Sequence, residues 1–108
     1  MKRGDLVTVA AQGDYGKPRP AVVIQSDALA DADSVLVALL TSALRDAPFY
    51  RMSLASAETN GLKTESQVMV DKIIAYPRGK CGDAMGRLSD RDMPVLNAML
   101  SVMIGLAD

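Results

Sequence analysis

Hydrophobic residues in the first four-fifths of the chain fall into short runs and alternations that predict β-strands. The predicted strands cover residues 6–11, 21–25, 34–42, 49–55, 66–76 and 84–88. Most of these segments are rich in Val, Ile and Leu, and Gly, Pro, Asp or Asn residues separate them. The segment from Val35 to Leu40 is apolar without interruption, which is typical of a central strand covered on both faces. The 49–55 segment alternates instead, and it predicts an antiparallel strand with one exposed face.

The tail of the chain has the period of a helix. Its apolar residues recur at a spacing of about 3.6, at Leu96, Met99, Leu100, Met103 and Leu106. Pro94 is tolerated only near a helix start, so we expect the helix to begin close to Asp92, with Ser89 or Asp92 as its cap. Further apolar residues widen the surface beyond a single stripe: Val95, Val102 and Ile104. Such a helix is either deeply buried or shared with a partner.

These elements indicate a mainly β fold with a C-terminal α-helix, in the α+β class. The intervals between the predicted strands are too short for the crossover helices of a parallel sheet. We therefore expect a small, strongly bent antiparallel sheet or barrel, with its strands within residues 4–88 and the helix at 90–106. Since 108 residues is the length of one ordinary domain, we expect residues 1–108 to form a single domain.

Composition restricts the chemistry. The sequence has no histidine, which excludes histidine general bases, Ser-His-Asp and Cys-His nucleophiles and histidine metal ligands. Cys81 is the only cysteine, so an intrachain disulfide and a cysteine-rich zinc site are excluded too. A lone thiol is typical of a reducing cytoplasm, and no apolar run approaches the roughly 18 residues of a membrane span. We expect neither a metal nor a cofactor.

Charge gives a second restriction. With 12 Lys and Arg residues against 13 Asp and Glu residues, the net charge is −1, so any basic site must be local. One candidate lies in residues 12–20, whose glycines and prolines predict a loop. Pro18 and Pro20 bracket Arg19, and each proline restricts the backbone. We therefore expect Arg19 to stand on a stiff, extended stem at the mouth of the next strand.

Five pieces of the sequence resemble the MazF/PemK family of toxin endoribonucleases. In chain order they are Arg3-Gly4-Asp5-Leu6-Val7, Arg19-Pro20-Ala21-Val22-Val23-Ile24-Gln25, Leu39-Leu40-Thr41-Ser42, Gly61-Leu62 with Ser66-Gln67-Val68, and Gly86-Arg87-Leu88-Ser89. No single piece is specific, but five in order with compatible spacing cover nearly the whole chain. The resemblance implies an SH3-like barrel of the MazF/CcdB/Kid toxin type, which forms homodimers and binds an antitoxin.

The resemblance also implies a reaction. The family cleaves single-stranded RNA at specific sequences without a metal, leaves 2′,3′-cyclic phosphate and 5′-hydroxyl ends, and so inhibits translation and growth. Arg19 and Thr41 match its principal catalytic arginine and threonine. A guanidinium suits the charge on phosphate oxygens because its planar donors match phosphate geometry. Thr41 suits positioning of the 2′-OH or the phosphate, and Ser42 and Gln25 are further candidates for catalysis or RNA positioning. The alternative reading is that the hydroxyls at 41 and 42 only bond to the backbone where a strand ends.

Other charged residues remain open between two roles. Asp71 matches an aspartate that some relatives combine with an arginine two positions earlier and a histidine in the first loop. Here Met69 stands at the arginine's position and histidine is absent, so Asp71 is a candidate for catalysis or RNA positioning, or a structural acceptor. Lys17, Lys72 and Arg78 are candidates for RNA binding, with ordinary surface charge as the alternative.

Three functions fit the sequence. CcdB-like toxins share the fold and poison DNA gyrase without an active site, and a non-catalytic SH3-like interaction module is the third reading. The Arg19-Pro20 element and the strand end at Thr41 favour the ribonuclease. As partners we expect RNA, a second copy of the chain, and an antitoxin. Its acidic, disordered tail is expected to fold over the groove of the dimer and to block the loop from Gln12 to Arg19, where Lys17 and Arg19 are cationic. We expect no membrane partner.

Overall fold

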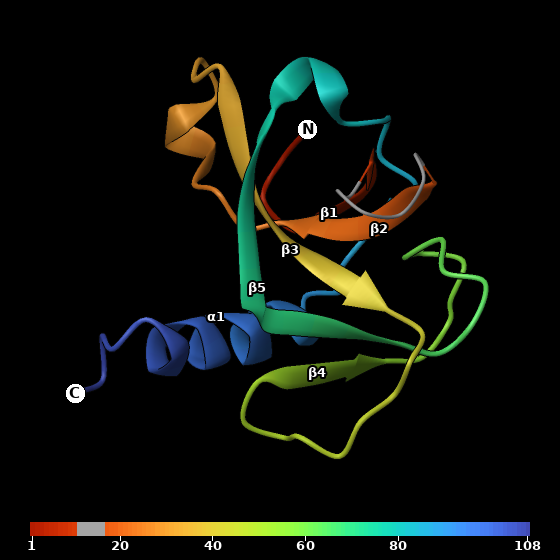
Figure 1. The fold of residues 1–108 in the computed structure, drawn as a ribbon, viewed down its shortest axis with the longest axis vertical. Coiled ribbons are helices and arrows are strands. Elements are labelled where there is room, and N and C mark those ends of the chain that lie inside the picture. Colours follow the sequence, from red (N-terminus) through yellow and green to blue (C-terminus); the bar gives the residue numbers. More distant parts are fainter. Residues whose placement is uncertain (11–16) are drawn as a thin grey trace.

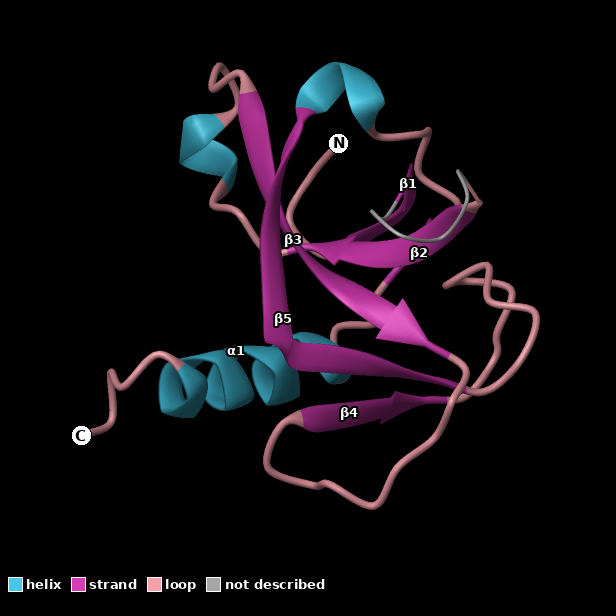
Figure 2. Cartoon of the chain, viewed as in Figure 1, coloured by secondary structure: helices cyan, strands magenta, loops and turns pink. Residues whose placement is uncertain are grey.

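The structure is a computed structural model that describes residues 1–10 and 17–108. Its strands form one antiparallel sheet in the order β4-β5-β3-β2-β1-β6, with one α-helix packed against it (Figures 1 and 2). The strands are β1 (Asp5–Ala10), β2 (Pro18–Val23), β3 (Ser34–Thr41), β4 (Arg51–Leu54), β5 (Ser66–Pro77) and β6 (Gly86–Arg87). The helices are the 3₁₀ turns η1 (Asp27–Leu29) and η2 (Arg78–Lys80) and the α-helix α1 (Asp92–Met103). The predicted mainly β fold with a C-terminal helix is confirmed. In these two ranges, no helix is long and apolar enough to cross a membrane.

A sharp bend in β5 curls the sheet (Figure 1). Ala38 of β3 pairs with Ile73, but Leu40 pairs with Val68, so residues 69–72 of β5 stand opposite a single residue of β3. Such a bulge increases the local twist and turns the strand. The first half of β5 therefore pairs with both β3 and β4, and the second half pairs with β3. The strand predicted for residues 66–76 is confirmed as one strand, and it is bent.

Because the sheet curls, hydrophobic residues are buried on both of its faces. One core lies between the sheet and α1, and it includes Leu6, Val22, Leu40, Val68 and Leu96. A second core on the other face includes Val7, Val9, Val23, Val37 and Met69. Neighbouring residues in a strand point to opposite faces, so one continuous apolar run supplies both cores. The prediction that β3 is a central strand covered on both faces is confirmed.

Two local predictions differ from the structure. The 12–20 segment is not all loop, because β2 begins at Pro18 and Arg19 lies inside the strand, paired with Val9 of β1. Residues 11–16 lie outside the described residues. A strand accepts proline where it has no donor to supply, and β2 does not pair with β3 at Pro18 or Pro20. At the tail, α1 begins at Asp92 as predicted, but it ends at Met103 instead of residue 106, and its N-cap position is Arg91, which makes no side-chain cap bond. The Ser89 hydroxyl oxygen accepts the Asp92 N–H at 3.1 Å.

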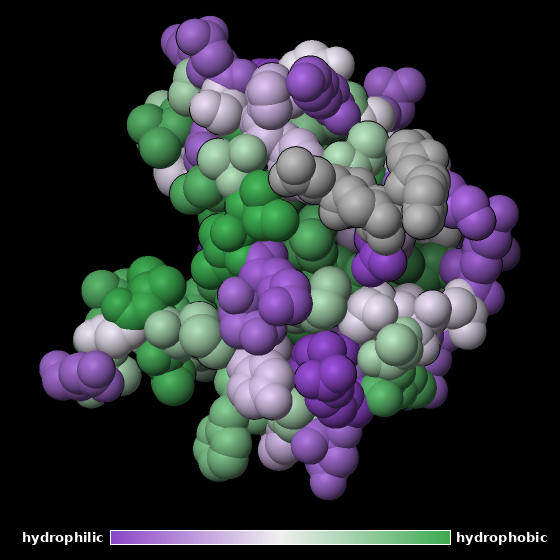
Figure 3. Space-filling view, in the orientation of Figure 1, coloured by the Kyte–Doolittle hydropathy of each residue, from purple (hydrophilic) through white to green (hydrophobic). Residues whose placement is uncertain are grey.

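The apolar surface of α1 is only partly covered by the chain itself. Leu96 is fully buried, whereas Val95, Val102 and Ile104 are 47%, 58% and 59% exposed. In Figure 3, hydrophobic residues gather where the C-terminal part of α1 extends from the body. The prediction that the helix is deeply buried within its own chain is therefore wrong. The alternative prediction, that a partner covers its apolar surface, stays open.

Candidate active site

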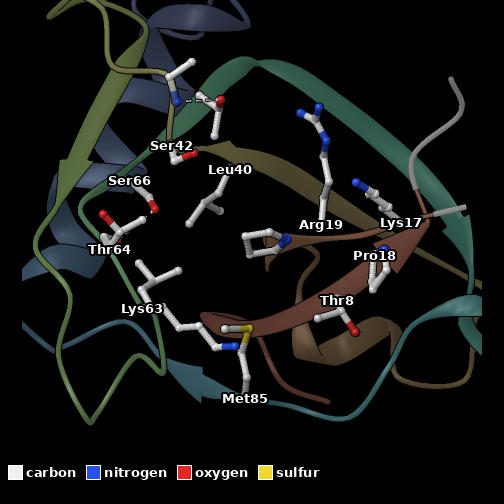
Figure 4. A pocket seen from close by; sticks show the side chains of 14 residues that line it. Thr8, Lys17, Pro18, Arg19, Leu40, Ser42, Lys63, Thr64, Ser66 and Met85 are labelled. Carbon is white, nitrogen blue, oxygen red and sulfur yellow. Dashed lines mark hydrogen bonds between the residues drawn. The ribbon is translucent and has the colours of Figure 1, made fainter. Parts of the chain in front are cut away.

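An open cavity of about 820 Å³ lies between the start of β2 and the end of β3. Its facing wall is the segment before β5, so three separate parts of the chain line it (Figure 4). The side chains around it include Thr8, Lys17, Arg19, Leu40, Thr41, Ser42, Lys63, Thr64, Ser66 and Met85. In Figure 4, Arg19 and Lys17 extend from one side, and Lys63, Thr64 and Ser66 lie on the other.

The direction of backbone groups in β2 explains where the cavity opens. The N–H of Ile24, directly after β2, donates to the carbonyl oxygen of Leu36 in β3 at 3.0 Å. In an antiparallel strand, residues two apart direct their backbone groups to the same neighbour. The backbone N–H and carbonyl groups of even-numbered residues of β2 therefore point toward β3. Those of odd-numbered residues, including Arg19, point toward β1.

Pro18 and Pro20 occupy even-numbered positions at the start of β2, and neither has an N–H. The β2–β3 register, if continued, would set Pro20 against Leu40 and Pro18 against Ser42. β2 has no donor to offer β3 at either pair, and the pairing of the two strands ends at Ala21. The strands diverge beyond that point, and the cavity lies between their ends.

Arg19 and Thr41 both line this cavity. Each lies two residues beyond the last β2–β3 pair, Ala21 with Leu39, and both side chains are half-buried. The Thr41 Oγ1 accepts the N–H of Ala43 at 3.1 Å, drawn as a dashed line in Figure 4. That bond is the backbone contact expected at a strand end, and it also orients the hydroxyl, whose O–H is the group left to donate.

The cavity is cationic although the protein is not. Lys17, Arg19 and Lys63 line it, and no carboxylate stands among the described residues around it. Two other cavities among the described residues, of about 420 and 410 Å³, are lined by carboxylates as well as by cations. In a chain of net charge −1, this grouping is a basic site confined to one place, the only kind that the net charge allows.

Two glycine contacts hold the facing wall in place. A side chain at Gly86 would collide with the backbone of Asn60, and one at Gly61 would collide with the backbone carbonyl of Met85. Gly61 also has a φ of +72°, which favours glycine. The Gly61 and Gly86 pieces of the family pattern are thus two sides of one close contact. Because this contact fixes the segment that contains Lys63, it places Lys63 beside the cavity.

Three of the residues that line the cavity were not predicted from the sequence. Lys63, Thr64 and Thr8 carried no local signal, because a lysine or threonine in a loop or a half-exposed strand is ordinary. Ser66 was noted only within a motif, and Lys17 and Ser42 were predicted and do line the cavity.

The structure does not bring Gln25 and Arg78 to the cavity. The Gln25 amide nitrogen donates to the carbonyl oxygens of Leu29 and Ser34 at 3.3 and 3.2 Å. The Arg78 guanidinium donates to the carbonyl oxygens of Ala32 at 2.7 Å and Leu29 at 3.1 Å. Both side chains therefore brace the connection between β2 and β3, and both line the smaller cavity beside it.

Asp71 and Lys72 are also away from the cavity lining. Both are exposed at the bend of β5. Cys81 is half-buried, its thiol lies 3.8 Å from the carbonyl oxygen of Pro77, and burial raises the pKa of this thiol while Arg78 opposes the shift. Within the described part of the chain, no three His, Cys, Asp or Glu side chains gather as candidate metal ligands.

Known proteins resemble this chain in sequence and in fold. Residues 2–104 match the family described as PemK-like, MazF-like toxin of type II toxin-antitoxin system. The chain is 40% identical over 108 residues to the probable endoribonuclease MazF of Mycolicibacterium smegmatis, covering 99% of both chains. Among solved structures, Mycobacterium tuberculosis toxin MazF-mt6 has a TM-score of 0.80 at 20% identity, over 94% of this chain and 96% of that one. A mycobacterial endoribonuclease in complex with its cognate antitoxin has a TM-score of 0.79 at 21% identity, over 98% and 96%.

Proposed function

Because the chain belongs to the PemK-like, MazF-like toxins of type II toxin–antitoxin systems, we propose that it is an endoribonuclease that cleaves single-stranded RNA in the cavity between β2 and β3. The observation that carries this proposal is that Arg19 and Thr41 line one cationic cavity. Arg19 and Thr41 were chosen from sequence pieces far apart in the chain. The relative from Mycolicibacterium smegmatis, named as an endoribonuclease, supports the same activity.

The reaction is a transesterification in which the 2′-hydroxyl attacks the neighbouring phosphorus. The 2′-OH loses its proton, a bond forms between O2′ and phosphorus, the bond from phosphorus to O5′ breaks, and O5′ gains a proton. In this scheme Arg19 binds the non-bridging oxygens and stabilises the charge that grows on them. The Thr41 hydroxyl positions the 2′-OH or the phosphate, and Ser42 offers a second hydroxyl nearby.

The remaining cations bind the rest of the RNA strand. Lys17 and Lys63 lie on opposite sides of the cavity (Figure 4), so a strand that passes between them meets a positive charge on each side. Lysine is a mobile point charge, which suits flanking phosphates better than the reacting one. Because Asp71, Lys72, Gln25 and Arg78 lie away from the cavity, they have no part in this scheme.

We also propose that the toxin is a homodimer. Val95, Val102, Ile104 and Leu106 expose between 47% and 73% of their surface on and directly after α1. A contiguous apolar surface of this kind on a small domain is typical of an interface. A second copy, bringing an identical surface, is the occupant that buries it symmetrically.

An antitoxin is the proposed regulator. A site that binds phosphodiesters also binds carboxylates, so an acidic segment that folds over Lys17 and Arg19 would block the cavity. The mycobacterial endoribonuclease solved with its cognate antitoxin supports such a partner. Because the substrate is RNA, we place the action of this toxin in the cytoplasm.

Cleavage of a defined RNA in EDTA tests the proposed function. We expect cleavage to persist, the new ends to be a 2′,3′-cyclic phosphate and a 5′-hydroxyl, and Thr41→Ala to slow the reaction. Activity that EDTA abolishes would contradict the metal-independent scheme. Intact RNA together with blocked gyrase supercoiling would replace it with the CcdB-like function.

A further inference from the structure

Gln67 is a buried amide beside the proposed catalytic threonine. It lies in β5, is 6% exposed, and pairs with Thr41 of β3 on one side and with Ser53 of β4 on the other. A buried amide must find hydrogen-bond partners, and the partners it finds show what it holds in place.

The Gln67 side chain binds both backbone groups of Arg45. Its Oε1 accepts the Arg45 N–H at 3.0 Å, and its Nε2 donates to the Arg45 carbonyl oxygen at 3.0 Å. Nε2 also donates to the Ser53 hydroxyl oxygen at 3.2 Å. The side chain therefore pairs with Arg45 as a strand would, and it fixes the segment that leaves β3 although residues 43–46 are exposed.

Arg51 of β4 extends this contact toward the cavity. Its Nη1 donates to the Gln67 Oε1 at 3.1 Å and to the carbonyl oxygen of Ala43 at 3.2 Å. The N–H of Ala43 in turn donates to the Thr41 Oγ1 at 3.1 Å. A continuous path of hydrogen bonds therefore joins Gln67, Arg51, Ala43 and Thr41.

Stability alone does not account for this arrangement. The Arg51 Nε is buried and has no hydrogen-bond partner in the part of the chain that is described, and an unpaired buried donor lowers stability. The guanidinium is thus held where its Nη1 reaches the carbonyl oxygen of Ala43, although its Nε is left without a hydrogen bond. What this placement secures is the backbone directly after Thr41.

From this geometry we propose that Gln67 is a positioning residue that, with Arg51, orients the Thr41 hydroxyl for RNA cleavage. The inference rests on the proposed function. Gln67 and Arg51 do not line the cavity and act only through the Ala43 N–H bond to Thr41. Losing that bond frees the hydroxyl to rotate, so the chemical step slows while RNA binding is kept.

A double-mutant cycle tests the proposal. We expect Gln67→Leu to lower kcat on the order of 10-fold with KM nearly unchanged. In the Thr41→Ala background the same substitution should change kcat by less than about 2-fold, because the hydroxyl it positions is gone. Gln67→Glu keeps the acceptor for Arg51 and should restore part of kcat. An equal loss of kcat in both backgrounds would overturn the proposal.

Further variants separate positioning from folding. Arg51→Met removes the hydrogen bond to Ala43 but leaves Gln67 paired with Arg45. It replaces Gln67→Leu in the cycle if that variant does not fold, and it too should lower kcat only when Thr41 is present. Val35→Ala, in the second core at the far end of β3, is the control for lost stability and should leave kcat unchanged below its melting temperature. If Thr41→Ala itself leaves kcat unchanged, the assignment of Thr41 fails and the inference fails with it. If Thr41→Ala slows cleavage but the effects add, only the inference fails.

Discussion

The two prolines at the start of β2 lead to a prediction in which one substitution lowers RNA cleavage and leaves stability nearly unchanged. Pro20 faces β3 and cannot donate to it, so Pro20→Ala places a new N–H opposite Leu40. We expect this N–H to bond to the Leu40 carbonyl oxygen, extend the β2–β3 pairing and narrow the cavity.

The free energy of unfolding should hardly change. One new backbone hydrogen bond contributes about 0.5–1.5 kcal/mol, and losing the restriction of proline in the unfolded chain costs about 0.4–1 kcal/mol. The two effects oppose each other, so the net change is below about 1 kcal/mol. RNA cleavage should nevertheless fall, since a shift of about 1 Å between reacting groups can cost about 100-fold in rate.

Amide hydrogen exchange measures the new bond directly. A bond of about 1.4 kcal/mol slows exchange of the amide at position 20 about tenfold relative to a free amide. Pro48→Ala, in the exposed connection between β3 and β4, is the control for the loss of proline alone. An amide at position 20 that exchanges freely, together with unchanged RNA cleavage, would refute the idea that the prolines open the cavity.

Three more predictions concern other parts of the molecule. In urea titrations, Gly86→Ala should lower the free energy of unfolding by about 1–3 kcal/mol because the added Cβ collides with the backbone of Asn60. Gly79→Ala, with open space around it, should change that free energy by less than about 1 kcal/mol, and equal effects would contradict the close contact. Val102→Asp should convert the dimer to a folded monomer of 11.5 kDa by light scattering, and an unchanged mass would place the interface elsewhere. Because burial raises the pKa of Cys81, less thiolate is present at pH 8 than for an exposed cysteine, and alkylation of Cys81 should be slow. Arg78→Met should raise this pKa further and slow alkylation again, and faster alkylation in the variant would contradict the prediction.

Periodicity predicted the elements of this fold because each depends on which face of a strand or helix is buried. The uninterrupted run in β3 and the spacing of Leu96 and its neighbours in α1 are direct consequences of burial. Arg19 was misplaced, as a residue of a loop stem, since proline is read as a strand breaker. A strand whose prolines all face the same neighbour is a case that local rules do not distinguish from a loop.

The candidate site was only partly readable for a related reason. Arg19, Thr41, Ser42 and Lys17 could be selected because they belong to motifs or lie beside them, and all four line the cavity. Lys63 reaches the cavity through contacts between segments distant in sequence. Such contacts have no local signature, and neither do the hydrogen bonds of Gln67.

The most direct test of the account is the single-turnover rate of RNA cleavage by Arg19→Ala, with Lys17→Ala as the matched control. Both residues are cations on the same side of the cavity, but Arg19 is half-buried within β2 whereas Lys17 is exposed just before the strand. We expect Arg19→Ala to lower the rate by about 10²- to 10³-fold with the fold intact. Lys17→Ala should mainly weaken RNA binding in a salt-dependent way. Wild-type cleavage by a folded Arg19→Ala variant would contradict the account.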